Sequence, residues 1–263
     1  MIGIFDSGVG GMTVAHAIEK ALPDLNLIYF GDLARTPYGS KSCETIDRYA
    51  RENIDFLISK GATLIVIACN SAASVVTSKT LAAFDLPVFD VIAPAVRRVE
   101  QLAGNSGKKL RVGVIGTRAT VKSGVYAKKI GQVCPESTVI SAACPLLVPL
   151  VEEGWLNKRE TKMILRRYLH PLRIKQVEAL VLGCTHYPLL KGLIQPKIGK
   201  RVTVIDSSEE VAASLKHYLE THSEFAGSLE KGGEKRFFVS DVTDAATLTA
   251  KKIFGRPIKL TRI

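Results

Sequence analysis

The sequence predicts an α/β protein with two similar open-sheet domains that face each other across a central cleft. Short apolar runs, typical of buried strands, end in small polar turns that lead into helical patterns. Cys69 and Cys184 each follow such a run, and they lie 115 positions apart. A second strand-and-turn pattern, at 3–7 and 113–117, recurs at a separation of 110. These matching separations indicate a duplicated unit with one cysteine in each half.

In the first half, apolar runs and helical spacing define four strands and four helices. Strands are predicted over 2–5, 27–30, 64–68 and 87–92, and helices over 11–22, 43–59, 70–84 and 93–102. Asn70 and Ser71 are good helix caps. Because Cys69 directly precedes that helix, its positive end is expected to lower the pKa of the thiol.

The second half repeats the alternation of strands and helices, and it ends with one additional strand and one additional helix. Strands are predicted over 111–115, 139–143, 179–182, 202–205 and 237–239, and helices over 121–130, 158–171, 210–220 and 243–254. The last strand and helix are more than the second half needs, so we expect them to return to the first domain. The predicted domains are 1–94 plus 207–263, and 95–206, with 103–109 as a linker.

Composition excludes several classes of protein. No apolar run reaches the ~18 residues of a membrane span, and the N-terminus does not resemble a signal peptide. Five cysteines without zinc spacing indicate free thiols in the cytoplasm and no metal site. The net charge of +11 is densest at 158–175, where a solvated helix face is favoured over nucleic-acid binding. The sequence carries no signal for or against a homodimer.

Several polar positions have an ordinary structural explanation beside a functional one. The glycine-rich turn at 6–11 suits an anion, but it is not a dinucleotide fingerprint and also fits a simple strand-to-helix turn. The long polar loop at 31–40 contains a Pro-Tyr-Gly turn. On spacing alone Glu152 is more typical of a solvated carboxylate. His186, two residues after Cys184, can tune a thiol or contact a substrate.

Taken together, five motifs resemble those of the glutamate racemases over nearly the whole chain. They are Asp6-Ser7-Gly8-Val9-Gly10-Gly11, Gly31-Asp32 with Pro37-Tyr38-Gly39, Ala68-Cys69-Asn70-Ser71-Ala72, Gly113 to Thr117, and Gly183-Cys184-Thr185-His186-Tyr187-Pro188. The resemblance implies a racemase without a cofactor that supplies D-glutamate for peptidoglycan. Where that pattern has a small residue this chain has Asp90, and a changed pocket wall is expected there.

The resemblance also implies the site. Cys69 and Cys184 are expected to be the two bases, acting on D- and L-glutamate respectively. Side chains expected to assist or tune the thiols are Asp6, Asp32, Glu152 and His186. Residues expected to bind the substrate are Asp6, Ser7, Asp32, Pro37, Tyr38, Gly39, Asn70, Ser71, Thr117, Thr185 and His186.

Two thiols suit inversion of an α-carbon, because one base can take the proton from one face while the other returns a proton to the opposite face. A free thiol titrates near ~8.5, so both of its protonation states are accessible near neutral pH. Three alternatives stay open: a cysteine hydrolase using Cys184 and His186, a racemase or decarboxylase for aspartate, hydantoins or malonates, and a nucleic-acid binder supported by charge alone.

Overall fold

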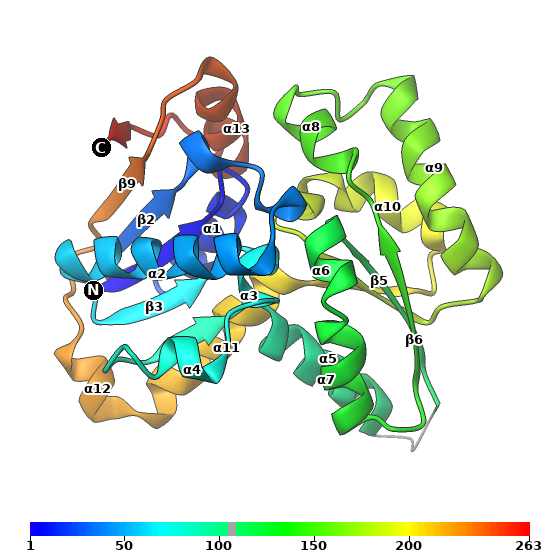
Figure 1. Ribbon diagram of the computed structural model, residues 1–263, viewed down its shortest axis with the longest axis horizontal. Coiled ribbons are helices and arrows are strands. Elements are labelled where there is room, and N and C mark those ends of the chain that lie inside the picture. The colour runs from blue at the N-terminus through cyan, green and yellow to red at the C-terminus, as the bar shows by residue number, and fades with distance from the viewer. Residues whose placement is uncertain (105–108) are drawn as a thin grey trace.

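Two parallel sheets organise the computed structural model, which describes residues 1–104 and 109–263 (Figure 1). The first has the order β10-β9-β2-β1-β3-β4 and the second the order β6-β5-β7-β8. The strands are β1 (Ile2–Asp6), β2 (Leu27–Gly31), β3 (Leu64–Ile67), β4 (Val88–Asp90), β5 (Arg111–Gly116), β6 (Thr138–Ala143), β7 (Ala179–Gly183), β8 (Thr203–Asp206), β9 (Lys235–Val239) and β10 (Leu260–Arg262). The predicted fold class is confirmed.

Helices join the strands and cover the sheets. They are α1 (Met12–Ala21), α2 (Cys43–Ser59), α3 (Asn70–Ala73), α4 (Ser78–Leu81), α5 (Ile92–Gly104), α6 (Arg118–Lys122), α7 (Val125–Val133), α8 (Leu147–Glu152), α9 (Arg159–Ile174), α10 (Lys191–Ile198), α11 (Ser207–Thr221), α12 (Ser223–Ser228) and α13 (Asp244–Phe254). Short 3-10 turns are η1 (Leu33–Arg35), η2 (Tyr38–Ser40) and η3 (Tyr187–Leu190).

Alternation along β1 shows how the core is divided. Ile2 and Ile4 point to one face of the first sheet, whereas Phe5 points to the other, where it packs with α2. The core around Ile2 and Ile4 continues through α1, α5 and α11 to Val112 and Val181 of the second sheet. One apolar core therefore joins the two sheets, while β7 also faces a separate core beneath α8, α9 and α10.

The C-terminal segment returns to the first sheet, as predicted. Strand β9 pairs in parallel with β2, and β10 pairs with β9. The boundary predicted at 94/95 falls inside the continuous helix α5, and the domain limits stay a prediction. The predicted linker at 103–109 lies partly outside the described residues.

Two predicted helices are each divided in the structure. The helix expected over 70–84 ends at Ala73, and α4 begins after Thr77, whose side chain caps it by accepting from the Thr80 amide. The intervening β-branched residues disfavour a helix. The helix expected over 121–130 is interrupted at Gly124, whose φ of 65° is left-handed. Strand β10, which is only three residues long, was not predicted.

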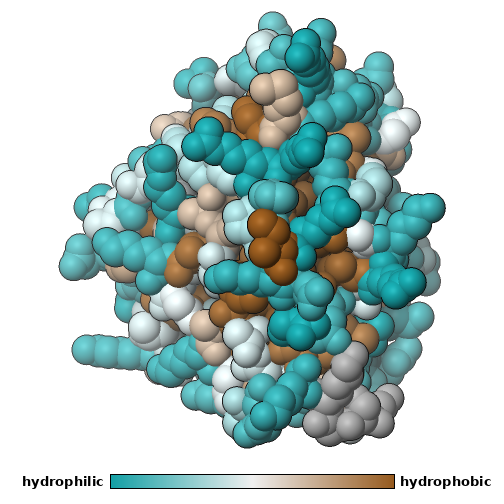
Figure 2. Space-filling view, turned by 90° about the vertical axis from the view of Figure 1, so that its right-hand side faces the viewer, coloured by the Kyte–Doolittle hydropathy of each residue, from teal (hydrophilic) through white to brown (hydrophobic). Residues whose placement is uncertain are grey.

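The basic side chains of α9 lie on its exposed side, as the solvated-face interpretation expected. Figure 2 shows the side of the molecule that bears α9, where hydrophilic residues predominate and a few hydrophobic ones lie between them. None of the helices in the described part of the chain is long and apolar enough to cross a membrane.

The separate core beneath α9 provides a test of packing. Leu165 of α9 is fully buried, whereas Leu248 of α13 is 66% exposed. We expect Leu165→Ala to lower the free energy of unfolding by about 2–5 kcal/mol because it leaves a cavity. The matched change Leu248→Ala should alter it by less than about 0.5 kcal/mol. Urea denaturation of both variants measures this, and equal losses would contradict the assigned core.

Candidate active site

A cavity of about 370 Å³ lies between the two halves, where the carboxyl ends of strands from both sheets meet. Ligands bind at this edge in open α/β sheets. Its walls are formed by Ser7, Thr36, Pro37, Tyr38, Gly39, Ser40, Cys69, Asn70, Ser71, Thr117, Arg118, Pro145, Val148, Pro149, Glu152, Cys184, Thr185 and His186. Thus most of the residues predicted from the sequence line one cavity.

Both predicted cysteines line this cavity and both are buried. Cys69 follows β3 and is 4% exposed, and Cys184 follows β7 and is 5% exposed. Each cysteine lies within two residues of the end of its strand, so a sheet fixes the position of each side chain. The duplicated pattern therefore brings one thiol from each half into the same pocket.

The surroundings of Cys69 differ from the prediction. Its Sγ lies 3.6 Å from Ser7 Oγ, and burial, together with the charge of Asp6, raises the pKa of Cys69 to about 12. The expected net lowering was wrong: the Ala72 amide of α3 does lower the pKa of Cys69, but burial and the charge of Asp6 outweigh it. Cys69 is therefore a neutral thiol near pH 7.

Cys184 belongs to a chain of contacts that crosses from β7 to α8. Its Sγ lies 3.9 Å from Nδ1 of His186, and Nε2 of that ring lies 3.1 Å from Oε1 of Glu152. Burial by itself lowers the pKa of His186, but the contacts with Cys184 and Glu152 outweigh it and raise that pKa to about 10. A buried imidazolium thus lies beside Cys184.

Asp6 lies behind the cavity wall and is 1% exposed. Its Oδ2 accepts from the Gly8 amide at 2.9 Å, and its Oδ1 accepts from Thr185 Oγ1 at 3.3 Å. Burial raises the pKa of Asp6, and the charge of His186 opposes this shift. Asp6 therefore links the glycine-rich turn of the first half to the cysteine loop of the second.

Asn70, Ser71 and Thr117 form a polar part of the wall. Asn70 Oδ1 accepts from the Tyr126 hydroxyl at 2.7 Å, while Asn70 Nδ2 is buried and has no hydrogen-bond partner among the residues that the structure describes. The hydroxyls of Ser71 and Thr117 lie 2.9 Å apart and join the two halves. An unpaired amide donor beside two hydroxyls can bind a carboxylate.

The loop after β2 supplies another part of the wall. A methyl group on Gly39 would lie 2.7 Å from Cβ of Thr117, so only glycine allows these two segments to approach so closely. Tyr38 lines the cavity, and its hydroxyl contacts Asp32, which does not line it. Asp32 thus reaches the cavity only through Tyr38.

Six further residues line the cavity that were not predicted from the sequence: Thr36, Ser40, Arg118, Pro145, Val148 and Pro149. Their positions depend on how the halves face each other, although Arg118 directly follows the predicted Thr117. The change expected around Asp90 is corrected: this residue does not line the cavity. Its Oδ1 accepts from the amides of Ile92 and Ala93 at the start of α5.

Among residues 1–104 and 109–263, no group of three or more His, Cys, Asp or Glu side chains is arranged to hold a metal ion. The fold and the cavity place the chain among two-domain α/β proteins with a ligand-sized cavity between the domains.

The chain belongs to the Asp/Glu/Hydantoin racemase family, whose model matches residues 11–215. It is 47% identical to a glutamate racemase of Geobacter metallireducens, over 97% of this chain and 92% of that protein. A glutamate racemase isoform of Bacillus anthracis has a TM-score of 0.90 at 34% identity, over 100% of this chain and 97% of that one. A Francisella tularensis glutamate racemase in complex with D-glutamate has the same TM-score and identity, over 100% and 96%. The chain is therefore an amino-acid racemase.

The contact between the two halves at Gly10 can be tested sterically. A Cβ on Gly10 would lie 2.4 Å from the His186 ring, which Glu152 holds in place. We expect Gly10→Ala to push the halves apart and to lower kcat/KM by at least about tenfold. Gly192→Ala in α10 is the control, because a Cβ there meets no atom within 4 Å. Steady-state kinetics of both variants measure this effect. Full activity of Gly10→Ala would contradict the role of this contact between the halves.

The raised pKa of His186 predicts a pH-dependent stability. The folded protein holds this proton up to about pH 10, whereas an unfolded histidine loses it near ~6.5. The stability contributed by His186 is therefore complete below about pH 6.5 and is lost as the pH rises to about 10. The difference in unfolding free energy between wild type and His186→Asn should shrink across that window.

Glu152→Gln is the matched variant for this measurement, since it keeps the size of the side chain but removes one anion from the imidazolium. Its unfolding free energy should depend less steeply on pH than that of the wild type. Denaturation series from pH 6 to 10 measure both effects. If the difference in unfolding free energy between wild type and His186→Asn does not change with pH, the positive charge assigned to His186 is wrong.

Proposed function

We propose that the protein interconverts L- and D-glutamate without a cofactor, with Cys69 and Cys184 as the two bases. The observation that carries this proposal is that two buried thiols, one from each half, line a single cavity of about 370 Å³. Inversion of a carbon centre needs a proton acceptor and a proton donor on opposite faces, and this arrangement supplies one of each.

The unequal surroundings of the thiols suit a reaction in which their protonation states differ. Burial and Asp6 keep Cys69 neutral, so it is ready to donate a proton. Beside Cys184, the His186 imidazolium balances the negative charge of a thiolate. In this direction Cys184 takes the α-proton while Cys69 gives its proton to the other face. The reverse reaction begins with the protonation states exchanged.

The remaining wall residues bind and orient the substrate. The Nδ2 of Asn70, unpaired within the described part of the chain, and the hydroxyls of Ser71 and Thr117 form hydrogen bonds to a carboxylate. These fixed donors also stabilise the extra negative charge that develops as the α-proton leaves. Ser7 and Thr185 lie beside the two thiols and complete the contacts near the reacting carbon.

Glutamate is favoured over other acids by the names of the similar proteins. The Geobacter metallireducens relative is a glutamate racemase, and the similar Francisella tularensis structure is a complex with D-glutamate. The family model also includes aspartate and hydantoin racemases, so the chain length of the acid is the point to test.

The cellular role that we propose is the supply of D-glutamate for peptidoglycan in the cytoplasm. It rests on the resemblance to glutamate racemases, and the five free thiols of the chain fit a reducing compartment. In this role the substrate is a small molecule, and neither a membrane nor a nucleic acid takes part.

The substrate is tested with dialysed protein by a chiral assay on L-glutamate, D-glutamate, L-aspartate and L-alanine. We expect racemisation of both glutamate enantiomers without any addition, and far slower turnover of the others. Activity that returns only with added pyridoxal phosphate would contradict the mechanism. A preference for aspartate would agree with the proposed mechanism but contradict glutamate as the substrate.

The separate roles of the cysteines are tested by exchange in deuterated water. Cys69→Ala and Cys184→Ala should each lower racemisation by at least about a hundredfold, because each removes a group that both directions need. The thiol that remains should still exchange the α-proton of one enantiomer: D-glutamate for Cys69 and L-glutamate for Cys184. Mass spectrometry after chiral separation measures the exchange.

Cys43→Ala is the control, since Cys43 is exposed on α2 and should tolerate the change with full activity. A Cys69→Ala variant that keeps full racemisation would contradict the two-base mechanism. The hydrolase alternative, which uses Cys184 and His186 and gives Cys69 no task, would be supported if the protein does not racemise but hydrolyses an ester or amide with or without Cys69. A double role for one thiol would appear as exchange of both enantiomers in a single variant.

A further inference from the structure

The hydroxyl of Tyr38 is held behind the cavity wall by two contacts. It donates a hydrogen bond to Asp32 Oδ2 and accepts one from Asn53 Nδ2 at 3.0 Å. Burial and Asp32 raise the pKa of Tyr38, so the hydroxyl stays protonated at physiological pH. Tyr38 is 1% exposed, and it lines the cavity together with its neighbours Pro37 and Gly39. The position of this loop therefore depends on what holds Asp32 and Asn53.

Asp32 is a carboxylate that is only 1% exposed, and a charge at that depth is costly unless it is paired. Nε of Arg35 lies 2.6 Å from Asp32 Oδ2. Ser240, at the end of β9, donates to Asp32 Oδ1 at 3.1 Å. Within residues 1–104 and 109–263, Arg35 is the only cation that the structure pairs with Asp32.

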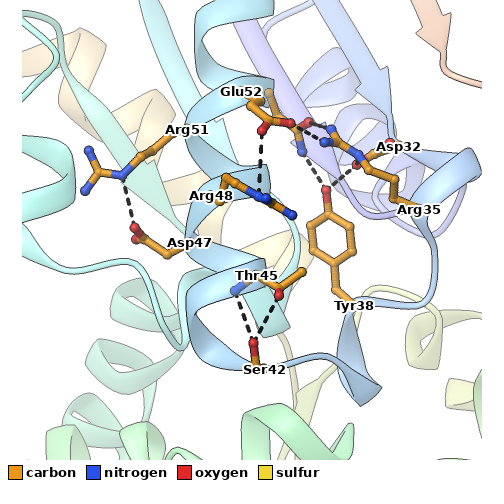
Figure 3. A network of polar contacts seen from close by, with 10 residues as sticks. Asp32, Arg35, Tyr38, Ser42, Thr45, Asp47, Arg48, Arg51 and Glu52 are labelled. Carbon is orange, nitrogen blue, oxygen red and sulfur yellow. Dashed lines mark hydrogen bonds and ion pairs between the residues drawn. The ribbon is translucent and has the colours of Figure 1, made fainter.

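Arg35 uses the rest of its guanidinium to hold the same group from a second side. Nη2 donates to Asn53 Oδ1 at 3.1 Å, and Nη1 pairs with Glu52. The guanidinium carbon lies 4.1 Å from the centre of the Tyr49 ring. Figure 3 shows Arg35 between Asp32 and Glu52, with the Tyr38 hydroxyl directed toward Asp32. Arg35 thus contacts both hydrogen-bond partners of Tyr38.

We propose that Arg35 is a positioning residue for the substrate cavity, which fixes Tyr38 and Gly39 through Asp32 and Asn53. The proposal rests on the proposed racemase function for its kinetic readout. Arg35 itself does not line the cavity, so its effect on the substrate is indirect. Gly39 packs directly against Thr117 of the second half, so a shift of the loop changes how closely the two halves approach there.

The geometry requires arginine and not merely a positive charge. A planar fork reaches Asp32, Asn53 and Glu52 at once and stacks on Tyr49, whereas an ammonium is a single point charge. Arg35→Lys should therefore restore only part of what Arg35→Met removes. Because the wall contacts the bound substrate and the transition state alike, the loss should appear mainly in KM.

The test compares Arg35→Met with Arg51→Met. Arg51 lies on α2 and pairs with Asp47 at 3.0 Å, in a contact that does not reach Tyr38 (Figure 3). We expect Arg35→Met to raise KM for both glutamate enantiomers by about tenfold, with kcat changed by less than about threefold. Arg51→Met should change neither constant. Equal effects of the two variants, or a loss confined to kcat, would overturn the proposal.

Hydrogen–deuterium exchange gives a readout that does not depend on activity. Amide exchange in the loop at 33–41 should become faster in Arg35→Met and stay unchanged in Arg51→Met. Unchanged exchange in Arg35→Met would overturn the proposal even if KM rose. If wild type does not racemise glutamate, the function is wrong, and faster exchange would still support the positioning role.

Glu52→Gln keeps the proposal testable if Arg35→Met does not fold. This change leaves the Arg35–Asp32 pair intact and weakens the outer contact with Arg35, together with a 3.9 Å pair to Arg48, at a carboxylate that is 49% exposed. KM should rise in the same direction as in Arg35→Met but by less, and the loop amides should exchange somewhat faster. A fully folded Glu52→Gln variant with wild-type KM and exchange would overturn the role of the outer contact.

Discussion

The absence of a side chain at Gly10 allows the two halves to share one pocket. Any Cβ there would overlap His186, so the cysteine loop of the second half lies directly against the glycine-rich turn of the first. A hydrogen bond from Thr13 Oγ1 to the Thr185 carbonyl, at 3.0 Å, holds the same contact. The cavity, the neighbouring charges and the distance between the thiols all depend on this approach.

Burial governs the chemistry of the groups around that contact. Asp6 and His186 are both buried, and the attraction between their opposite charges offsets part of the free energy that burial of each charge costs. A neutral Cys69 and a cation beside Cys184 follow from these neighbours and not from the cysteines themselves. Two thiols that look equivalent in the chain thus acquire different electrostatic surroundings.

Local patterns predicted the parts of the molecule that local forces determine. The strand ends that carry Cys69 and Cys184 were found because a buried parallel strand must be apolar and its end must turn. Arg118 and Val148 were missed because they reach the cavity only when the halves meet. The pKa shift of Cys69 was predicted in the wrong direction, since burial is a property of the assembled fold. Arg35 gave no signal because its partners on α2 lie 17 and 18 positions away.

The return of the C-terminal segment affects how the chain folds during synthesis. Strand β2 lies next to β1 in sequence, but its other edge pairs with β9, which the ribosome makes about two hundred residues later. Until then an apolar strand has an open edge of unpaired amides and carbonyls, which can pair with another chain. The nascent chain therefore carries this open edge until residues 235–239 emerge.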